Sequence, residues 1–270
     1  MSYESPIEKR IEADLASNSK KELSLRLIET KLEFLIKLDR FSEAFELLLE
    51  SISDFESIDS TKSKAQTICA ILLEKLSETS CAKTLDLITK LPNWILDENY
   101  IQFAIGKSYF KLGDTNKAEK CFKRSITLNP KNSEVYLTLA SLLEEKYPVK
   151  ALANYREYFS KNKTTSSAKI FVKKVKKLLS QFPKTIDFKP IKIAIIGNIT
   201  LQSIKPLLEA HCIHSGIQVQ FFFGGYNVFP QEMVASNSEL YNFSPKLTFL
   251  FLDAPTFIPE LFDNFFEVAP

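Results

Sequence analysis

Glycine is scarce in this sequence, with 6 in 270 residues, and there is one tryptophan and there are two histidines. So few glycines leave little room for turn-rich β architecture and favour helices and packed strands. The glycines that are present form neither a GxGxxG dinucleotide fingerprint nor a GxxxxGK[ST] phosphate loop, and no GxSxG nucleophile elbow occurs. The sequence therefore lacks three standard signals of nucleotide-dependent or serine-hydrolase chemistry.

A strong charge excess and a long apolar run are missing as well. The formal net charge is +2, which by itself predicts neither nucleic acid nor a membrane surface as a partner. No apolar run approaches the ~20 residues that span a bilayer. The polar, acidic start, MSYESPIEKRIEADLAS, resembles no secretory signal. The four scattered cysteines then indicate reduced thiols, and we expect a cytoplasmic protein.

The two histidines do not form a convincing metal motif. His211 and His214 flank Cys212, but this spacing gives two or three ligands at most and no fourth nearby. Both histidines are predicted to lie in the last turn of a helix, where a cationic imidazole suits the helix dipole. We therefore expect no metal site, no catalytic residue and no cofactor in this chain.

Residues 99–132 carry the clearest pattern in the chain. Small residues at Gly106 and Ala118 allow two antiparallel helices to approach closely, while Tyr109 and Phe122 fill the space between them. This order and spacing resemble the tetratricopeptide (TPR) repeat. One such unit cannot bury its apolar face alone, so we expect further repeats beside it.

Weaker helix pairs surround this repeat. Residues 133–161 repeat the pattern, and eroded pairs precede it, one turning near Asp39 and one between Lys64 and Leu91. The polar residues 52–63 are predicted to form a connector between these two pairs.

Residues 166–182 form an amphipathic helix with a lysine-rich face. Such a helix can bind anionic membranes, nucleic acid or a calmodulin-like groove, but covering the last apolar face of a repeat array is the favoured role. We expect a helical solenoid with its capping helix over residues 1–182, which binds a protein partner through its concave face and binds no nucleic acid.

The pattern changes after a proline-bounded linker at residues 183–190. Three β-rich runs at 191–196, 217–223 and 247–252 alternate with helical segments. This order predicts a partial doubly wound parallel sheet over residues 191–270. The predicted fold class is therefore α + α/β, with a TPR-type solenoid before the sheet.

Polar corners follow each of the three predicted strands. Because the carboxyl ends of parallel strands meet at one edge of the sheet, these corners could form a ligand site. Alternatively, the glycines serve tight turns and the aspartate caps the next segment. The candidate ligand-binding residues are Gly197, Asn198, Thr200, Gly225, Tyr226, Asn227 and Asp253.

The segment from Ile191 onward resembles the N-terminal domain of FkbH-like proteins of the haloacid dehalogenase (HAD) superfamily. The resemblance rests on IAIIGNIT, GGYNVFPQEM, SNSELYNFSP and LTFLFLD. That domain is similar to the SGNH-hydrolase fold, whose nucleophilic serine follows the first strand, where this chain has Gly197-Asn198-Ile199-Thr200. The resemblance implies a chain that stops before its catalytic HAD domain, and Mg²⁺ is expected only if that domain follows.

Several functions remain open at this point. The leading hypothesis is the docking and substrate-holding half of an FkbH-like protein in acyl- or glyceryl-carrier-protein biosynthesis, with the repeats binding a partner protein, possibly an acyl carrier protein. One alternative is a stand-alone TPR scaffold without catalysis, and a further one is an SGNH-type esterase. A TPR-fused glycosyltransferase ranks last, because the sequence has no nucleotide-phosphate loop.

Overall fold

The computed structural model describes residues 6–56, 59–183, 185–186 and 188–257. The outer ends of both predicted domains, residues 1–5 and 258–270, lie outside the described residues. The chain divides into two compact units, unit 1 at Met1–Val135 and unit 2 at Tyr136–Pro270. The predicted linker at 183–190 stays a prediction.

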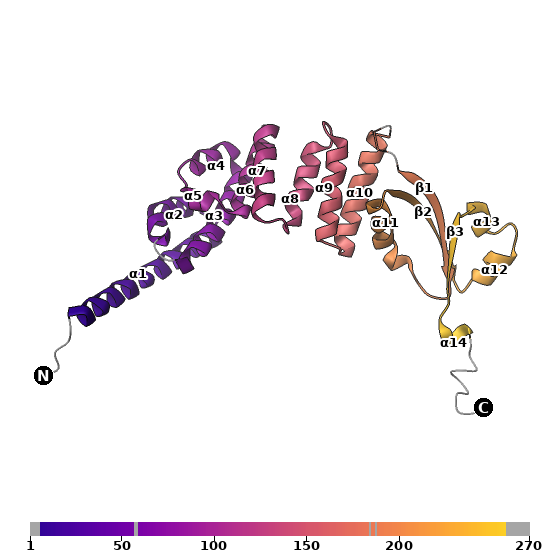
Figure 1. Ribbon diagram of the computed structural model, residues 1–270, viewed down its shortest axis with the longest axis horizontal. Coiled ribbons are helices and arrows are strands. Elements are labelled where there is room, and N and C mark those ends of the chain that lie inside the picture. Colours follow the sequence, from indigo (N-terminus) through magenta and orange to yellow (C-terminus); the bar gives the residue numbers. More distant parts are fainter. Residues whose placement is uncertain (1–5, 57–58, 184, 187, 258–270) are drawn as a thin grey trace, which may run out of the picture. The chain divides into compact units, whose positions relative to one another are not determined.

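Unit 1 is built of successive helices, drawn in indigo to magenta in Figure 1. They are α1 (Pro6–Lys37), α2 (Phe41–Glu56), α3 (Asp59–Thr79), α4 (Cys81–Ile88), α5 (Asn93–Leu96), α6 (Asn99–Lys111) and α7 (Thr115–Leu128). Asp39 turns the chain between α1 and α2 with a φ of 57°. The Ser80 side chain accepts a hydrogen bond from the Lys83 amide and begins α4. The predicted connector at 52–63 is mostly helical, because α2 extends to Glu56 and α3 begins at Asp59.

The α6–α7 pair shows the close helix approach that the sequence predicts. A Cβ atom at Gly106 would lie 2.5 Å from Cε1 of Phe122, so only glycine leaves room for that ring. Ala118 and Phe122 are fully buried. Gly113 follows α6 with a φ of +80°, the left-handed conformation that ends helices. Gln102 donates to the Leu96 carbonyl at 2.7 Å, which explains a polar residue where the repeat usually has an aromatic one.

One apolar core joins α1 to α6 within unit 1. α2 and α3 each contribute a stripe at helical spacing, as expected of helices that pack in layers. The largest fully buried side chains of this core are Phe45, Phe55, Leu25, Leu32, Leu48, Leu72, Leu73 and Ile95.

Unit 2 combines helices with a small sheet. α8 (Ser133–Leu143) runs into this unit and is followed by α9 (Pro148–Lys161) and α10 (Thr165–Gln181). Thr164 and Ser167 form a capping box that begins α10. The apolar stripe of α10 is buried, and α10 packs against both α9 and α11 (Lys205–His214). α10 therefore packs on the preceding helix and on the next one, while its role as the cap of the repeat array stays a prediction.

Three parallel strands form the sheet, in the order β2-β1-β3: β1 (Lys189–Gly197), β2 (Ile217–Tyr226) and β3 (Leu247–Phe251). β1 begins two residues before the predicted Ile191. Ile193 and Ile195 pack toward Leu208 of α11, while Ile196 packs toward Leu240 of α13 on the other face.

The remaining short elements are η1 (Gln202–Ile204), α12 (Phe229–Val234), α13 (Glu239–Phe243) and α14 (Ala254–Phe257). The parallel sheet is confirmed, whereas the partial doubly wound α/β domain stays a prediction.

Candidate functional site

The predicted corner at the carboxyl ends of the strands brings several candidate residues together. Asn198 donates its amide to a carboxylate oxygen of Asp253, and its own side-chain oxygen accepts from the Asp253 backbone amide at 2.9 Å. The Asn198 backbone amide donates to Phe251 at 3.1 Å, and the Asn227 amide donates to Gly197 at 3.1 Å. Asn198 is buried, so these bonds tie the ends of all three strands.

Other candidates lie apart from these contacts. The Tyr226 side chain is 70% exposed, and Thr200 is exposed. Gly197 is required by close packing, because a Cβ there would lie 1.9 Å from the Phe251 carbonyl oxygen. A Cβ at Gly225 would lie 2.7 Å from Val228. The glycines thus have a packing role, and the ligand-binding role of this corner stays a prediction.

We expect Asn198→Ala to lower the free energy of unfolding by about 2 kcal/mol. The change removes two hydrogen bonds of a buried side chain, one to the Asp253 carboxylate and one from the Asp253 backbone amide. Urea denaturation followed by circular dichroism measures the change. Asn237→Ala is the control, since Asn237 is exposed and carries the same side chain. Equal stability of the two variants would show that the Asn198–Asp253 pair does not hold the strand ends.

The two histidines end α11 as predicted, but for a different reason. The rings of His211 and His214 lie 5.1 Å and 6.1 Å from the Phe159 ring. Burial and the nearby charge of Arg156 lower the pKa of His214, which favours the neutral ring rather than a cation at the helix end. Within the described residues, no three His, Cys, Asp or Glu side chains gather as a metal site would require.

Sequence reasoning did not find a groove that lies in unit 1 between α3 and α6. It has a volume of about 450 Å³. Two exposed hydrophobic side chains line this groove: Ile71 is 42% exposed and Tyr100 is 55% exposed. We call it the α3–α6 groove; its lining is Ser63, Gln66, Thr67, Ala70, Ile71, Glu74, Glu98, Tyr100, Phe103, Ala104, Lys107 and Glu134.

The two walls of the α3–α6 groove are held at a fixed spacing. Glu74 of α3 pairs with Lys107 of α6 at 2.6 Å, and the Lys107 ammonium lies 4.7 Å from the centroid of the Phe103 ring. Lys111 of α6 donates to the Ser77 carbonyl at 3.1 Å. These contacts join α3 and α6 across the groove.

A second groove lies on the other side of α3, against α1. It has a volume of about 450 Å³ and shares Ser63, Thr67 and Ile71 with the first, so the two grooves adjoin across α3. We call it the α1–α3 groove; its lining is Glu29, Glu33, Ile36, Lys37, Ser63, Lys64, Thr67, Ile68 and Ile71. The signal in the sequence is Ile71, an apolar residue beside, rather than within, the buried stripe of α3.

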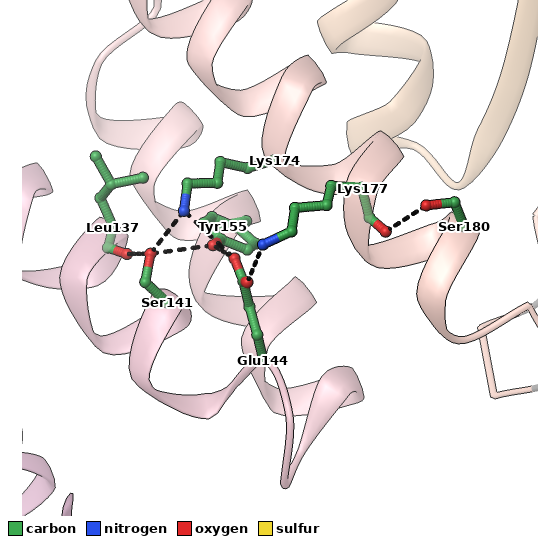
Figure 2. Close-up of polar contacts among 7 residues, drawn as sticks. All are labelled: Leu137, Ser141, Glu144, Tyr155, Lys174, Lys177 and Ser180. Atoms are coloured by element: carbon green, nitrogen blue, oxygen red, sulfur yellow. Dashed lines mark hydrogen bonds and ion pairs between the residues drawn. The ribbon is translucent and has the colours of Figure 1, made fainter. Parts of the chain in front are cut away.

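A polar cluster in unit 2 joins three helices, as Figure 2 shows. The Tyr155 hydroxyl of α9 donates to Glu144 at the end of α8, and it lies 3.2 Å from the Ser141 hydroxyl. From α10, Lys174 reaches Glu144 at 3.4 Å and Lys177 reaches it at 3.3 Å. Two lysines of the lysine-rich face of α10 thus form ion pairs within the protein.

The charges in this cluster stabilise one another. Burial alone would raise the pKa of Glu144, but the hydrogen bond from Tyr155 and the charges of Lys174 and Lys177 outweigh it, so the pKa lies below its usual value. Burial and the bond to Glu144 raise the pKa of Tyr155, which keeps the hydroxyl protonated. The cluster therefore consists of the neutral Tyr155 hydroxyl and two lysine cations around the Glu144 carboxylate. These contacts link α8, α9 and α10. Outside the cluster, Lys176 pairs with Glu209 of α11 at 2.5 Å.

The helices that the structure describes include none with the length and apolar character to cross a membrane.

Comparison with solved structures finds helical proteins at low identity. A MamA protein is 13% identical with a TM-score of 0.43, over 68% of this chain and 96% of its own. TTC0263, a thermophilic TPR protein of Thermus thermophilus, is 15% identical with a TM-score of 0.41, over 63% of this chain and 96% of its own. No curated protein matches the chain.

A family model matches the helix pair that the sequence singled out. The model describes the tetratricopeptide repeat, and it matches residues 100–132. This range falls on α6 and α7, the pair in which Gly106 admits the Phe122 ring. The repeat predicted at residues 99–132 is therefore a tetratricopeptide repeat.

Proposed function

We propose that this chain is an interaction scaffold whose helical repeats bind a segment of a partner protein in the α3–α6 groove. One observation carries the proposal: two exposed apolar side chains, Ile71 and Tyr100, line a groove between helices that are fixed by the Glu74–Lys107 ion pair. Aromatic and apolar anchors in preorganised grooves supply most of the binding energy in such complexes.

The size of the α3–α6 groove also suits a peptide. A volume of about 450 Å³ holds a few side chains rather than a whole folded surface. Recognition would then follow the mode in which a short segment places its anchors into a groove between helices. The protein that provides the segment is the partner predicted from the repeat pattern.

We expect Ile71→Asp to weaken binding of groove-binding peptides by about tenfold, because it places a charge where an apolar side chain must be buried. Peptides are selected from a random displayed library on the full chain, and their affinities are measured by fluorescence anisotropy. Leu112→Asp is the matched control, since Leu112 lies in the same unit, is 51% exposed and does not line the groove.

The two variants separate specific from general effects. Loss of binding in Ile71→Asp alone supports the groove as the binding site. Equal affinities for Ile71→Asp, Leu112→Asp and the unaltered chain would overturn the proposal, because peptides would then bind elsewhere.

A second candidate function concerns the sheet of unit 2. The ends of its three strands meet at Asn198 and Asp253, and the FkbH-like resemblance suggests an acyl- or carrier-linked substrate at this edge. In this proposal the chain is the docking and substrate-holding half of an FkbH-like protein, with an acyl carrier protein as its partner. Acylated and unacylated carrier protein are titrated into labelled chain, and shifts of the Asn198 and Tyr226 resonances are expected. Unchanged resonances would favour the scaffold without catalysis.

An SGNH-type esterase is a further alternative. It would need Thr200 as its nucleophile, so hydrolysis of simple acyl esters that is unaffected by Thr200→Ala removes this alternative. The cytoplasmic location, the absence of a cofactor, and a Mg²⁺ requirement that arises only with a HAD domain stay predictions.

A further inference from the structure

An apolar stripe runs along the outer face of α1. It consists of Leu23, Leu27, Phe34 and Leu38, which are between 49% and 67% exposed. Leu38 follows the last residue of α1 but keeps the helical bond, since its amide donates to the Phe34 carbonyl at 3.1 Å. The intervals along the stripe are one turn, two turns and one turn, so all four side chains share one side of the helix. We call these four residues the α1 stripe.

The fold of unit 1 uses the opposite side of α1. Leu25, Leu32 and Leu35 are buried in the core of unit 1. Leu25 and Leu32 lie about 140° or more around the helix axis from Leu27. α1 therefore has two apolar sides, whereas a surface helix of a globular protein normally has one and the outer helix of a repeat array needs a polar outer face. An exposed apolar surface of this extent indicates an interaction site.

The spacing of the α1 stripe is the same in both directions along the helix. A second α1 that lies antiparallel, centred between positions 30 and 31, brings Leu27 against Phe34 of the second copy. Leu23 then meets Leu38 of the second copy. Each apolar side chain gains an apolar neighbour across a two-fold axis, as the self-complementary interface of a homodimer requires. A membrane or an unrelated protein would require no such symmetry, so the spacing favours a second copy of this chain.

The charges beside the α1 stripe favour the antiparallel direction. Arg26 and Glu33 are both exposed and lie on the same flank of the stripe, about 100° around the helix from Leu27. In an antiparallel pair Arg26 lies across from Glu33 of the second copy, and the two-fold axis makes this contact twice. A parallel pair would instead place Arg26 near Lys31 of the second copy, which has the same charge. The contact of Arg26 with Glu22 on its own helix is between side chains that are more than half exposed, so it is weak.

The area of the α1 stripe is large enough for a homodimer of modest affinity. Its four side chains offer roughly 400 Å² of apolar surface in each chain. Pairing two stripes removes ~800 Å² from water before the flanking charged side chains are added, which approaches the ~1,000 Å² of a specific interface.

We propose that the α1 stripe binds a second copy of this chain, antiparallel about a two-fold axis between Thr30 and Lys31. This inference goes beyond the proposed binding of a partner segment, because the α3–α6 groove is lined by other residues. A dimer would carry two such grooves, so a partner with two binding segments would gain avidity where its linker spans both.

Sedimentation velocity of the full chain, from low micromolar to submillimolar concentration, tests this inference. The unaltered chain is expected to pass from monomer to dimer over this range. Leu27→Asp should raise the dissociation constant by about tenfold or more, because it would bury a charge against Phe34 of the second copy. Leu112→Asp is the matched control, since Leu112 is also an exposed leucine of unit 1 and lies outside the stripe. Circular dichroism checks that each variant keeps its helices.

Charge reversal tests the antiparallel direction. Arg26→Glu and Glu33→Arg should each weaken the dimer by about fivefold, since each places like charges across the interface twice. The double variant restores opposite charges and should dimerise like the unaltered chain. If Leu27→Asp does not fold, these charge variants alone decide.

Three results would contradict the inference. A chain that stays monomeric at every concentration overturns it, including a chain whose stripe instead binds vesicles of phosphatidylcholine and phosphatidylserine. A dimer that is equally stable in Leu27→Asp and Leu112→Asp forms through another surface. A double charge variant that dimerises no better than the two single variants overturns the antiparallel pairing.

Discussion

Replacing Gly106 by leucine is expected to lower the free energy of unfolding by about 3 kcal/mol, at the upper end of the usual cost of overpacking a core. Even the first added atom would lie 2.5 Å from Cε1 and 2.6 Å from Cδ1 of Phe122. The Phe122 ring is fully buried and is tilted against Phe103 at 5.8 Å, so it cannot move aside without disturbing a second ring. Urea denaturation followed by the fluorescence of Trp94, the single tryptophan, measures the change within unit 1.

Two controls assign this loss to the clash. Lys120→Leu adds the same side chain at an exposed position of α7 and should change stability by less than about 0.5 kcal/mol. In a Phe122→Ala background, leucine at position 106 should be far less harmful, because the truncated ring leaves the space that leucine needs. Strictly additive losses in the double variant would show that the two residues do not compete for one space.

The α6–α7 pair shows what a sequence pattern can predict. Gly106, Ala118 and Phe122 recur at fixed spacing within one helix pair, so the close approach follows from local sequence alone. The parallel strands were also predictable, because β-rich runs alternate with helices. The turn near Asp39 was predictable too, because apolar residues such as Leu32 and Leu48 keep the helical period on either side of it, and the structure buries both.

Contacts between distant segments were less predictable. The α3–α6 groove depends on how two helices meet, and nothing local marks Glu74 as the partner of Lys107, 33 residues away. Likewise, the lysines of α10 appear in the sequence as a solvated face, and the sequence does not show that Lys174 and Lys177 converge on Glu144. Helix periodicity predicts which side of a helix is polar, whereas the partners of that side depend on the register between helices.

Replacing Glu144 by alanine is expected to lower the free energy of unfolding by about 2 kcal/mol, because it leaves the buried Tyr155 hydroxyl without this acceptor and removes the carboxylate that two partly exposed lysines face. Two helices lose a shared acceptor: the Tyr155 hydroxyl is on α9, and the ammonium groups of Lys174 and Lys177 are on α10. The lysine side chains are 35% and 55% exposed and regain water, which keeps the loss from being larger. Thermal or urea denaturation followed by far-ultraviolet circular dichroism measures the change.

Two further variants test whether the loss comes from the charge of Glu144 and whether it is specific to this position. Glu145→Ala removes the adjacent, exposed glutamate and should leave stability almost unchanged. Glu144→Gln keeps an oxygen that can accept from Tyr155 but removes the charge that the lysines face, so its loss should be intermediate. If all three variants unfold alike, the cluster does not hold the helices together.

The pH dependence of stability gives an independent test of the same carboxylate. The pKa of Glu144 is lower in the folded chain than its usual value in an unfolded one. Its contribution is therefore fully present above the unfolded pKa, and it is lost as the pH falls through the folded pKa, because protonation then costs more in the folded state. Relative to Glu144→Gln, the unaltered chain should lose its stability advantage on acidification. A difference between the two that stays constant from neutral to acidic pH would show that the lysines and Tyr155 do not stabilise the ionised form.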